Sequence, residues 1–309
     1  MSVSDLPKNS DVLPWIDGRA AEYLARKTNL SGNAWLQDEV ATRMAQRLPL
    51  IRQAPKLWLD WQPRTGGLAG LKLVKKHYPD AEAIAVQAQS LDLQWLQKAQ
   101  QTSWWRLWKP RHQSYSNEKN FNADMVWSNM LLHQHADPFG LMKAWSSALN
   151  SQGFVMFSCL GPDTLQELRE VYRHMNWPVP HHAFTDMHDW GDMLLKAGFS
   201  QPVMDMERIT LTYENAENVL KDLRSWGRNL NPDRFSAMRG RRWREQLCAE
   251  VNRQLGSGSH EGRLGLSFEI IYGHAFKAAI PSTASVETRV PLQDIKQMLQ
   301  ARKTGQGKP

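Results

Sequence analysis

The chain has 309 residues, 41% of them hydrophobic and 22% charged, which suits one elaborated globular domain or two small ones and excludes global disorder. No run of about 18 apolar residues and no secretion-signal pattern occurs, so we expect a cytoplasmic protein with no membrane span. The formal net charge is +7, and its basic clusters at 234–253 and 296–308 favour a solvated helical face or an acidic protein partner over nucleic acid.

Apolar periodicity in the first half of the chain predicts strands that alternate with helices. We expect helices over 15–48, 68–77, 91–100 and 138–149, and strands over 56–60, 83–87, 104–108, 125–129 and 154–160. In the first helix, Leu36, Val40, Met44 and Leu48 form one apolar stripe. The alternation indicates a mostly parallel sheet covered by helices on both faces.

The second half departs from this rhythm. We expect helices over 162–174, 186–197, 216–227, 234–255 and 292–302, and two long alternating strands over 203–213 and 264–278. Two long strands so late in the chain predict an antiparallel pair that closes one edge of the sheet.

The segment from Leu57 to Gly70 occupies the place of a cofactor loop, between a short buried strand and a helix. A turn that cradles a phosphate or carboxylate uses glycines at a G-x-G-x-G spacing, because its backbone adopts positive φ and lets the ligand come close. Here these three positions hold Gln62, Arg64 and Gly66. Two interpretations stay open: a retained cofactor pocket, or a loop that no longer binds a ligand.

Two further positions lie at the same predicted edge of the sheet. The second strand ends in Gln87, where a carboxylate commonly accepts ribose hydroxyls, and glutamine offers uncharged hydrogen bonds there. Asn129 and His133 follow a later strand. They would line a pocket, with His133 as a base near neutral pH, or they would form a strand-to-helix turn.

The histidines and cysteines give no sign of a metal centre. His181, His182 and His188 have no metal-type spacing and no cysteine nearby. Cys159 and Cys248 lie far apart in apolar surroundings, which suits a reducing compartment. We therefore expect neither a metal site nor a disulfide framework.

Two arginines on one predicted helix are candidates for binding an anionic substrate. Arg169 and Arg173 lie one helical turn apart, and with Arg224 or Arg228 they would clamp a carboxylate. The alternative is a pair of surface ion pairs with the acidic residues of the same helix.

Six segments of the chain, taken together, carry a family resemblance. They span residues 19–23, 36–44, 124–132, 157–169, 184–189 and 268–276. In these segments the chain resembles class I S-adenosylmethionine-dependent methyltransferases, and more narrowly the malonyl-ACP O-methyltransferase family of biotin synthesis. The resemblance implies a Rossmann-like α/β fold: a seven-stranded methyltransferase sheet with the last strand antiparallel, helices on both faces, and a helical lid after the fifth strand.

The same resemblance implies a division of the chain into four parts. These are an N-terminal helical segment (1–50), an S-adenosylmethionine-binding Rossmann half (51–160), lid helices with the closing strands (161–280), and a C-terminal tail (281–309).

The resemblance also implies a site and a reaction. The residues expected around the cofactor are Tyr23, Asp60, Gln62, Arg64, Gly66, Gln87 and Asn129. Arg169 would face the substrate carboxyl, which belongs to a malonyl thioester on an acyl carrier protein. This carboxylate would attack the sulfonium methyl group in line, with positioning as the main source of catalysis. The changed loop residues leave one alternative, an inactive protein on the same scaffold that binds a partner or serves regulation.

Overall fold

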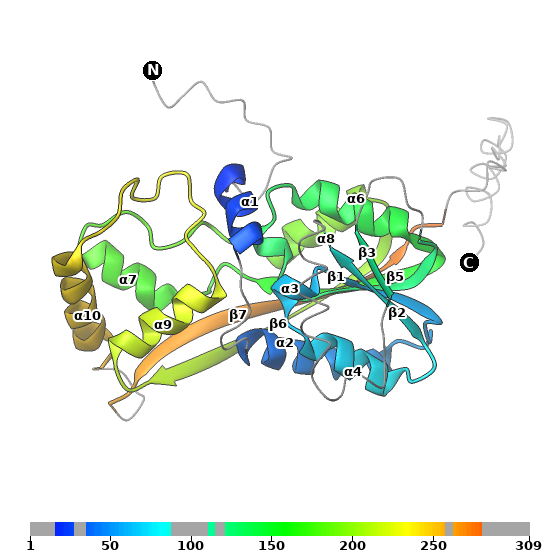
Figure 1. Cartoon of the computed structure of the whole chain (residues 1–309), viewed down its shortest axis with the longest axis horizontal. Helices are drawn as coiled ribbons and strands as arrows, with labels where there is room; N and C mark the ends of the chain where they lie inside the picture. Colours follow the sequence, from blue (N-terminus) through cyan, green and yellow to red (C-terminus); the bar gives the residue numbers. More distant parts are fainter. Residues whose placement is uncertain (1–15, 28–34, 88–110, 115–120, 257–261, 280–309) are drawn as a thin grey trace, which may run out of the picture. The chain divides into compact units, whose positions relative to one another are not determined.

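Seven strands within the described residues form one mixed sheet, in the order β3–β2–β1–β4–β5–β7–β6 (Figure 1). The strands are β1 (Leu57–Trp61), β2 (Glu82–Gln87), β3 (Arg111–Ser114), β4 (Ala123–Ser128), β5 (Leu149–Leu160), β6 (Phe199–Tyr213) and β7 (Leu264–Lys277). The first five pair in parallel, and β7 runs antiparallel to both β5 and β6. The predicted parallel sheet with an antiparallel closing pair is thus confirmed.

The structure is a computed structural model that describes residues 16–27, 35–87, 111–114, 121–256 and 262–279. The chain up to Ala278 forms one compact unit. Of the predicted elements, the helices 91–100 and 292–302 and the strand 104–108 lie outside the described residues. Across the described ranges, no helix combines the length and the apolar character that a bilayer crossing requires.

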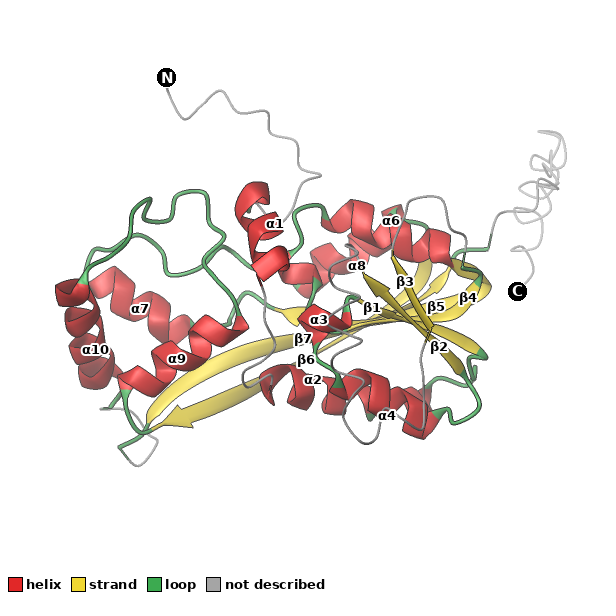
Figure 2. Ribbon diagram, in the orientation of Figure 1, coloured by secondary structure: helices red, strands yellow, loops and turns green. Residues whose placement is uncertain are grey.

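Helices cover both faces of the sheet because successive strand residues point to opposite sides. The helices α2 (Trp35–Ala45) and α4 (Ala69–His77) lie on one face, and α6 (Pro138–Ala148) and α8 (Met187–Lys196) lie on the other (Figure 2). Neighbouring residues of β1 point to opposite faces of the sheet: Trp58 belongs to the core on the α2 side, and Leu59 belongs to the core on the α6 side. Both side chains are fully buried.

The paired strands β6 and β7 extend beyond β5 and carry the lid. Pairing between β5 and β7 ends at Leu160 and Ile270, whereas β6 and β7 remain paired as far as Tyr213 and Leu264. Three helices pack together at this end: α7 (Gln166–His174), α9 (Ala216–Trp226) and α10 (Arg241–Leu255) (Figure 1). In the sequence α7 lies between β5 and β6, whereas α9 and α10 lie between β6 and β7. All three lie within the range 161–280 that was expected to hold the lid helices and the closing strands.

Two predicted helices differ from the observed ones. Within the expected helix 15–48 the structure describes α1 (Gly18–Lys27), α2 and a short 3-10 turn at Leu48–Leu50, and residues 28–34 lie outside the described residues. The expected helix 234–255 begins only at Arg241, and Arg234 lies outside it in an ion pair with Asp17. The Arg234 Nη2 to Asp17 Oδ2 distance is 2.8 Å, and this ion pair ties the segment before α10 to α1.

Candidate active site

The loop after β1 keeps a tight turn although glycine is absent from its first position. Gln62 adopts the left-handed conformation, with φ of 54° and ψ of 57°. Its N–H donates to the carbonyl of Val86 at 2.8 Å, and its carbonyl accepts from Thr65 and Gly66 at 2.9 and 3.2 Å. These bonds close the one-turn helix α3 (Pro63–Gly66). They hold a non-glycine residue in a conformation that costs about 1–2 kcal/mol.

The two glycines that remain in this loop stand where packing requires them. A Cβ on Gly66 would lie 2.7 Å from the carbonyl oxygen of Asn129, so no larger residue fits. Gly67 has a φ of 84°, and a Cβ there would lie 2.9 Å from Oδ1 of Asp38. Arg64 sits within α3, half-buried, and has no positive φ. The glycine expected at position 64 is therefore not needed for the backbone of this loop.

Asn129, at the end of β4, holds the loop in place. Its Nδ2 donates to the carbonyls of Gln37 at 2.8 Å and of Gly66, and its Oδ1 accepts from the hydroxyl of Ser158 at 2.7 Å. Both amide protons are thus used within the protein, across three elements that are far apart in the sequence. A direct contact of Asn129 with a cofactor stays a prediction.

Asp60 is the most unusual ionisable group near the loop. Its side chain is buried within β1, and among the described residues its Oδ2 has no hydrogen-bond partner. Burial raises the pKa of this carboxyl well above its usual range, because no counter-charge compensates for the loss of water. A buried carboxyl that lacks a partner fits a ligand that brings a positive charge to the end of β1.

The other two predicted cofactor residues lie on different elements. Gln87 is the last residue of β2 and pairs with Ser114 of β3, while its side chain lies outside the described residues. Tyr23 lies on α1 with 64% of its surface exposed. The helix α1 is tied to the lid, since Asp17 donates its N–H to the carbonyl of Leu230 at 2.8 Å. The structure therefore brings Asp60, Gln62, Gly66 and Asn129 together and places Tyr23 on a lid-bound helix.

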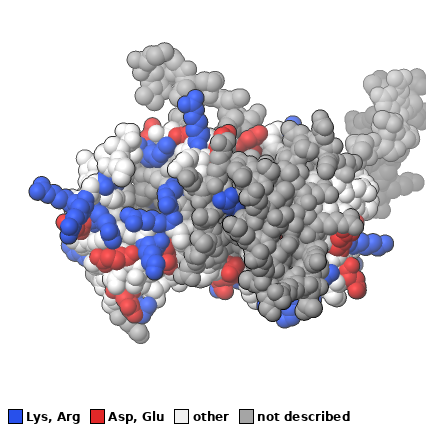
Figure 3. Space-filling model, in the orientation of Figure 1, with Lys and Arg blue, Asp and Glu red and all other residues white. Residues whose placement is uncertain are grey.

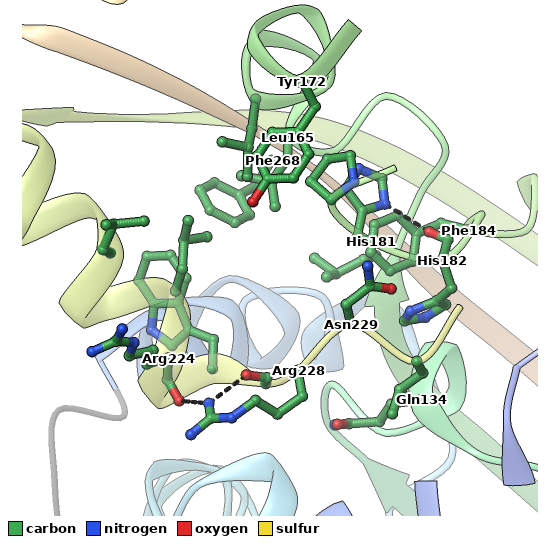
Figure 4. Close-up of a pocket in the computed structure, with 18 of the residues that line it drawn as sticks. Gln134, Leu165, Tyr172, His181, His182, Phe184, Arg224, Arg228, Asn229 and Phe268 are labelled. Atoms are coloured by element: carbon green, nitrogen blue, oxygen red, sulfur yellow. Dashed lines mark hydrogen bonds between the residues drawn. The ribbon is translucent and has the colours of Figure 1, made fainter. Parts of the chain in front are cut away.

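A pocket of about 270 Å³ lies between the lid helices and the ends of β4 and β5 (Figure 4). Its walls are largely apolar, with Leu165 and Tyr172 from the α7 side and Phe268 from β7. Figure 4 shows Arg224 on the opposite side of this pocket from His181 and His182. The pocket thus combines apolar walls with a few polar groups, as small-molecule sites do.

Three histidines along one wall of the pocket are connected by hydrogen bonds from ring nitrogens to backbone carbonyls. His181 donates from Nδ1 to the carbonyl of His182 at 2.6 Å, and His182 donates from Nε2 to the carbonyl of His133 at 2.8 Å. Phe184 stacks on His181 with 4.9 Å between ring centroids and meets the other two rings edge-on. The sequence did not predict this packing, since His181 and His182 are there only candidates for metal ligands. The aromatic Phe184, two residues after His182, was the one signal in the sequence that these rings pack together.

His133 does not behave as the predicted base near neutral pH. Its ring is buried, and its Nδ1 accepts from the N–H of Leu160 at 3.3 Å. Burial lowers its pKa to about 3, with a smaller contribution from His182, so the ring is neutral at physiological pH. The pKa of His181 falls to about 4, mainly through burial, and the charge of Arg169 contributes to this.

The four candidate arginines have different roles. Arg173 is exposed and pairs with Glu170 on its own helix, as the alternative interpretation expects. Arg228 donates to the carbonyls of Arg224 and Gly227, the latter at 2.7 Å, and so caps the end of α9. Arg169 is half-buried on α7 and its charge acts on His181, but it is not among the residues that line the pocket, whereas Arg224 and Arg228 are.

Within the ranges that the structure describes, no group of three or more His, Cys, Asp or Glu residues could hold a metal ion. Cys159 and Cys248 are both buried free thiols.

The sheet order and the loop after β1 define a Rossmann-like protein of the methyltransferase type. The YcgJ protein from Bacillus subtilis has this fold, with a TM-score of 0.50 and 14% identity over 78% of this chain and 98% of that one. No protein-family model matches the chain.

Curated relatives give the family. The malonyl-[acyl-carrier protein] O-methyltransferase of Laribacter hongkongensis is 36% identical over 257 residues, which cover 80% of this chain and 84% of the relative. The protein of the same name from Gallionella capsiferriformans is 35% identical and is covered to 86% of its length. This chain belongs to the malonyl-[acyl-carrier protein] O-methyltransferase family. The resemblance described above is confirmed, and an inactive scaffold is not favoured.

Proposed function

We propose that this protein transfers a methyl group from S-adenosylmethionine to the free carboxylate of a malonyl thioester on an acyl carrier protein, in biotin synthesis. The observation that carries the proposal is the 36% identity with a protein named for this reaction, over a match that covers 84% of that relative. The pocket between the lid and the ends of β4 and β5 supports it, because it offers a place for a small acyl group.

The residues at the end of β1 fit the cofactor. When bound, S-adenosylmethionine supplies an electrophilic methyl group on a positively charged sulfur. Asp60 would provide the compensating negative charge, since its buried Oδ2 has neither a hydrogen-bond partner nor a positive counter-charge among the described residues. Gln62 and Gly66 would give the turn and the close backbone approach. Tyr23, Arg64, Gln87 and Asn129 complete the set that we assign to cofactor binding.

The lid would bind and orient the substrate. We assign the substrate carboxylate to Arg169, whose charge acts on His181, a residue of the pocket wall. A carboxylate is already ionised at neutral pH, so its attack needs no general base, in keeping with the low pKa of His133. Apolar side chains of α7, α10 and β7 would exclude water, and exclusion of water strengthens the guanidinium–carboxylate attraction.

The proposal is tested by mass spectrometry of the intact carrier protein. The purified protein is incubated with S-adenosylmethionine and either a malonyl-loaded or an acetyl-loaded carrier. We expect the malonyl form to gain one methyl group and the acetyl form, which has no free carboxylate, to stay unchanged. A malonyl carrier that stays unmodified under saturating cofactor would contradict the proposal.

A further inference from the structure

The segment before α10 presents two large apolar side chains to solvent. Met238 is 99% exposed and Phe235 is 50% exposed. This segment is held at both ends, because Arg234 pairs with Asp17 and Arg239 stacks on aromatic rings. The Arg239 Cζ lies 4.1 Å from the ring centroid of Trp243 and 4.7 Å from that of Phe235. The exposed apolar side chains thus sit on a fixed surface, and such residues commonly mark a contact with a partner.

Unpaired positive charge lies directly beside these residues. Arg242 and Arg244 are exposed on the first turn of α10, and neither forms an ion pair with another described residue. By contrast, Arg241 on the same turn pairs with Glu245, with 2.9 Å between Nε and Oε1. Figure 3 shows blue side chains gathered over this end of the compact unit. Free guanidinium groups next to an apolar anchor suit an acidic protein surface.

The same surface borders the pocket. Arg244 and Trp243 of α10 line the pocket together with Arg224 of α9. A protein seated on the start of α10 would therefore stand next to the pocket opening, where an attached thioester arm has to enter.

We propose that Phe235, Met238, Arg239, Arg242 and Arg244 form the surface on which the acidic carrier protein docks. The inference rests on the proposed function, since it assigns a place to the partner of that reaction. Arg242 and Arg244 meet carboxylates of the carrier, Met238 and Phe235 fill its apolar contact, and the arm reaches the adjacent pocket. Electrostatic attraction of this kind acts on encounter and affinity rather than on the chemical step.

The test compares two malonyl thioesters with one double variant. In Arg241→Glu/Arg242→Glu, two exposed positions on the first turn of α10 that do not line the pocket, we expect the KM for the malonyl carrier to rise at least about tenfold at low ionic strength. The KM for malonyl-pantetheine, which has the arm but no carrier, stays unchanged. The difference between variant and parent shrinks as salt is added, because exposed charges are screened. Met238→Ala raises the carrier KM and Met238→Leu restores it.

Lys72→Glu/Lys76→Glu on α4 is the matched control, because it makes the same change of net charge away from the lid. An equal rise of the carrier KM in this control, or an equal rise for both thioesters in the lid variant, would overturn the docking surface. Nucleic acid that the parent retains and the lid variant releases, with an unchanged carrier KM, would also overturn it.

Failure of the proposed function looks different, since the parent would then methylate neither thioester. In that case the docking surface is tested by calorimetric titration of the parent, the lid variant and the α4 control with the carrier protein. Binding that the lid variant weakens and the α4 control leaves intact supports the surface, and absence of binding by the parent refutes it.

Discussion

Replacing Asp60 by asparagine should change the stability of the fold and the binding of a cationic cofactor in opposite directions. The carboxyl is buried and one of its oxygens has no partner among the described residues, so the charged form is strongly disfavoured. An unsatisfied buried polar group costs about 1–3 kcal/mol, and a charged one costs more. We expect Asp60→Asn to raise the free energy of unfolding by about 2 kcal/mol at pH 8, since the amide keeps the shape and removes the charge.

The direction of the pH dependence follows from the raised pKa of Asp60. Below pH 3.8, the ordinary pKa of an Asp carboxyl, it is protonated in both the folded and the unfolded chain, so the substitution has its smallest effect there. As the pH rises above that value, the unfolded chain loses the proton while the folded chain keeps it, and the folded state loses stability. The advantage of Asp60→Asn over the parent therefore grows with pH until the folded carboxyl has also ionised.

Urea unfolding of the parent and of Asp60→Asn between pH 4 and pH 8 measures how much more stable the variant is. Because the other titrating groups are the same in both proteins, their contributions cancel in the difference between the two free energies of unfolding. The same variant should bind S-adenosylhomocysteine and S-adenosylmethionine more weakly, with the larger loss for the positively charged sulfonium. A variant that is less stable than the parent at pH 8, or a difference that does not change with pH, would refute this account of Asp60.

Three further substitutions test the loop and the substrate site. Gly66→Ala should lower the free energy of unfolding by about 1–3 kcal/mol, because its Cβ would meet the Asn129 carbonyl at 2.7 Å. The control Gly191→Ala, inside α8 with no atom closer than 3.8 Å to the added Cβ, should not lower the urea midpoint. Arg169→Ala should raise the KM for the malonyl substrate about 10- to 100-fold and leave S-adenosylhomocysteine binding intact, and an unaltered KM would remove Arg169 from the site. Gln62→Gly relieves a left-handed residue and should keep the protein at least as stable, so a clear loss in thermal unfolding would speak against the strain assigned there.

The elements around the site were predictable because their patterns are local. The strand expected over 56–60 is observed at Leu57–Trp61, and all four residues of the expected apolar stripe are buried, because both patterns depend on burial periodicity. The bounds of the helix that carries the stripe were not predicted, since α2 spans only Trp35–Ala45. The prediction of a helix that begins at Arg234 was wrong over its first turns. Arg234 pairs instead with Asp17, 217 positions away, and no local sequence pattern encodes such a contact.

The behaviour of individual site residues was less predictable, again because it depends on distant neighbours. The near-neutral pKa expected for His133 was wrong, since burial between lid and sheet lowers it. The role of Asn129 as a clamp depends on Gln37 and Ser158, which lie 92 and 29 positions away. Gln62 keeps a left-handed conformation with the help of its hydrogen bond to Val86 of β2. The presence of glutamine in place of glycine in the sequence therefore did not reveal whether the tight turn still forms.

The central claim is that the altered loop still binds a sulfonium cofactor against the buried carboxyl of Asp60. Calorimetric titration of the full chain with S-adenosylmethionine and with S-adenosylhomocysteine measures this directly. We expect saturable one-to-one binding of both ligands, with the sulfonium form bound more tightly by the parent than by Asp60→Asn. The absence of heat and of any thermal shift at millimolar concentrations of either ligand would contradict the claim.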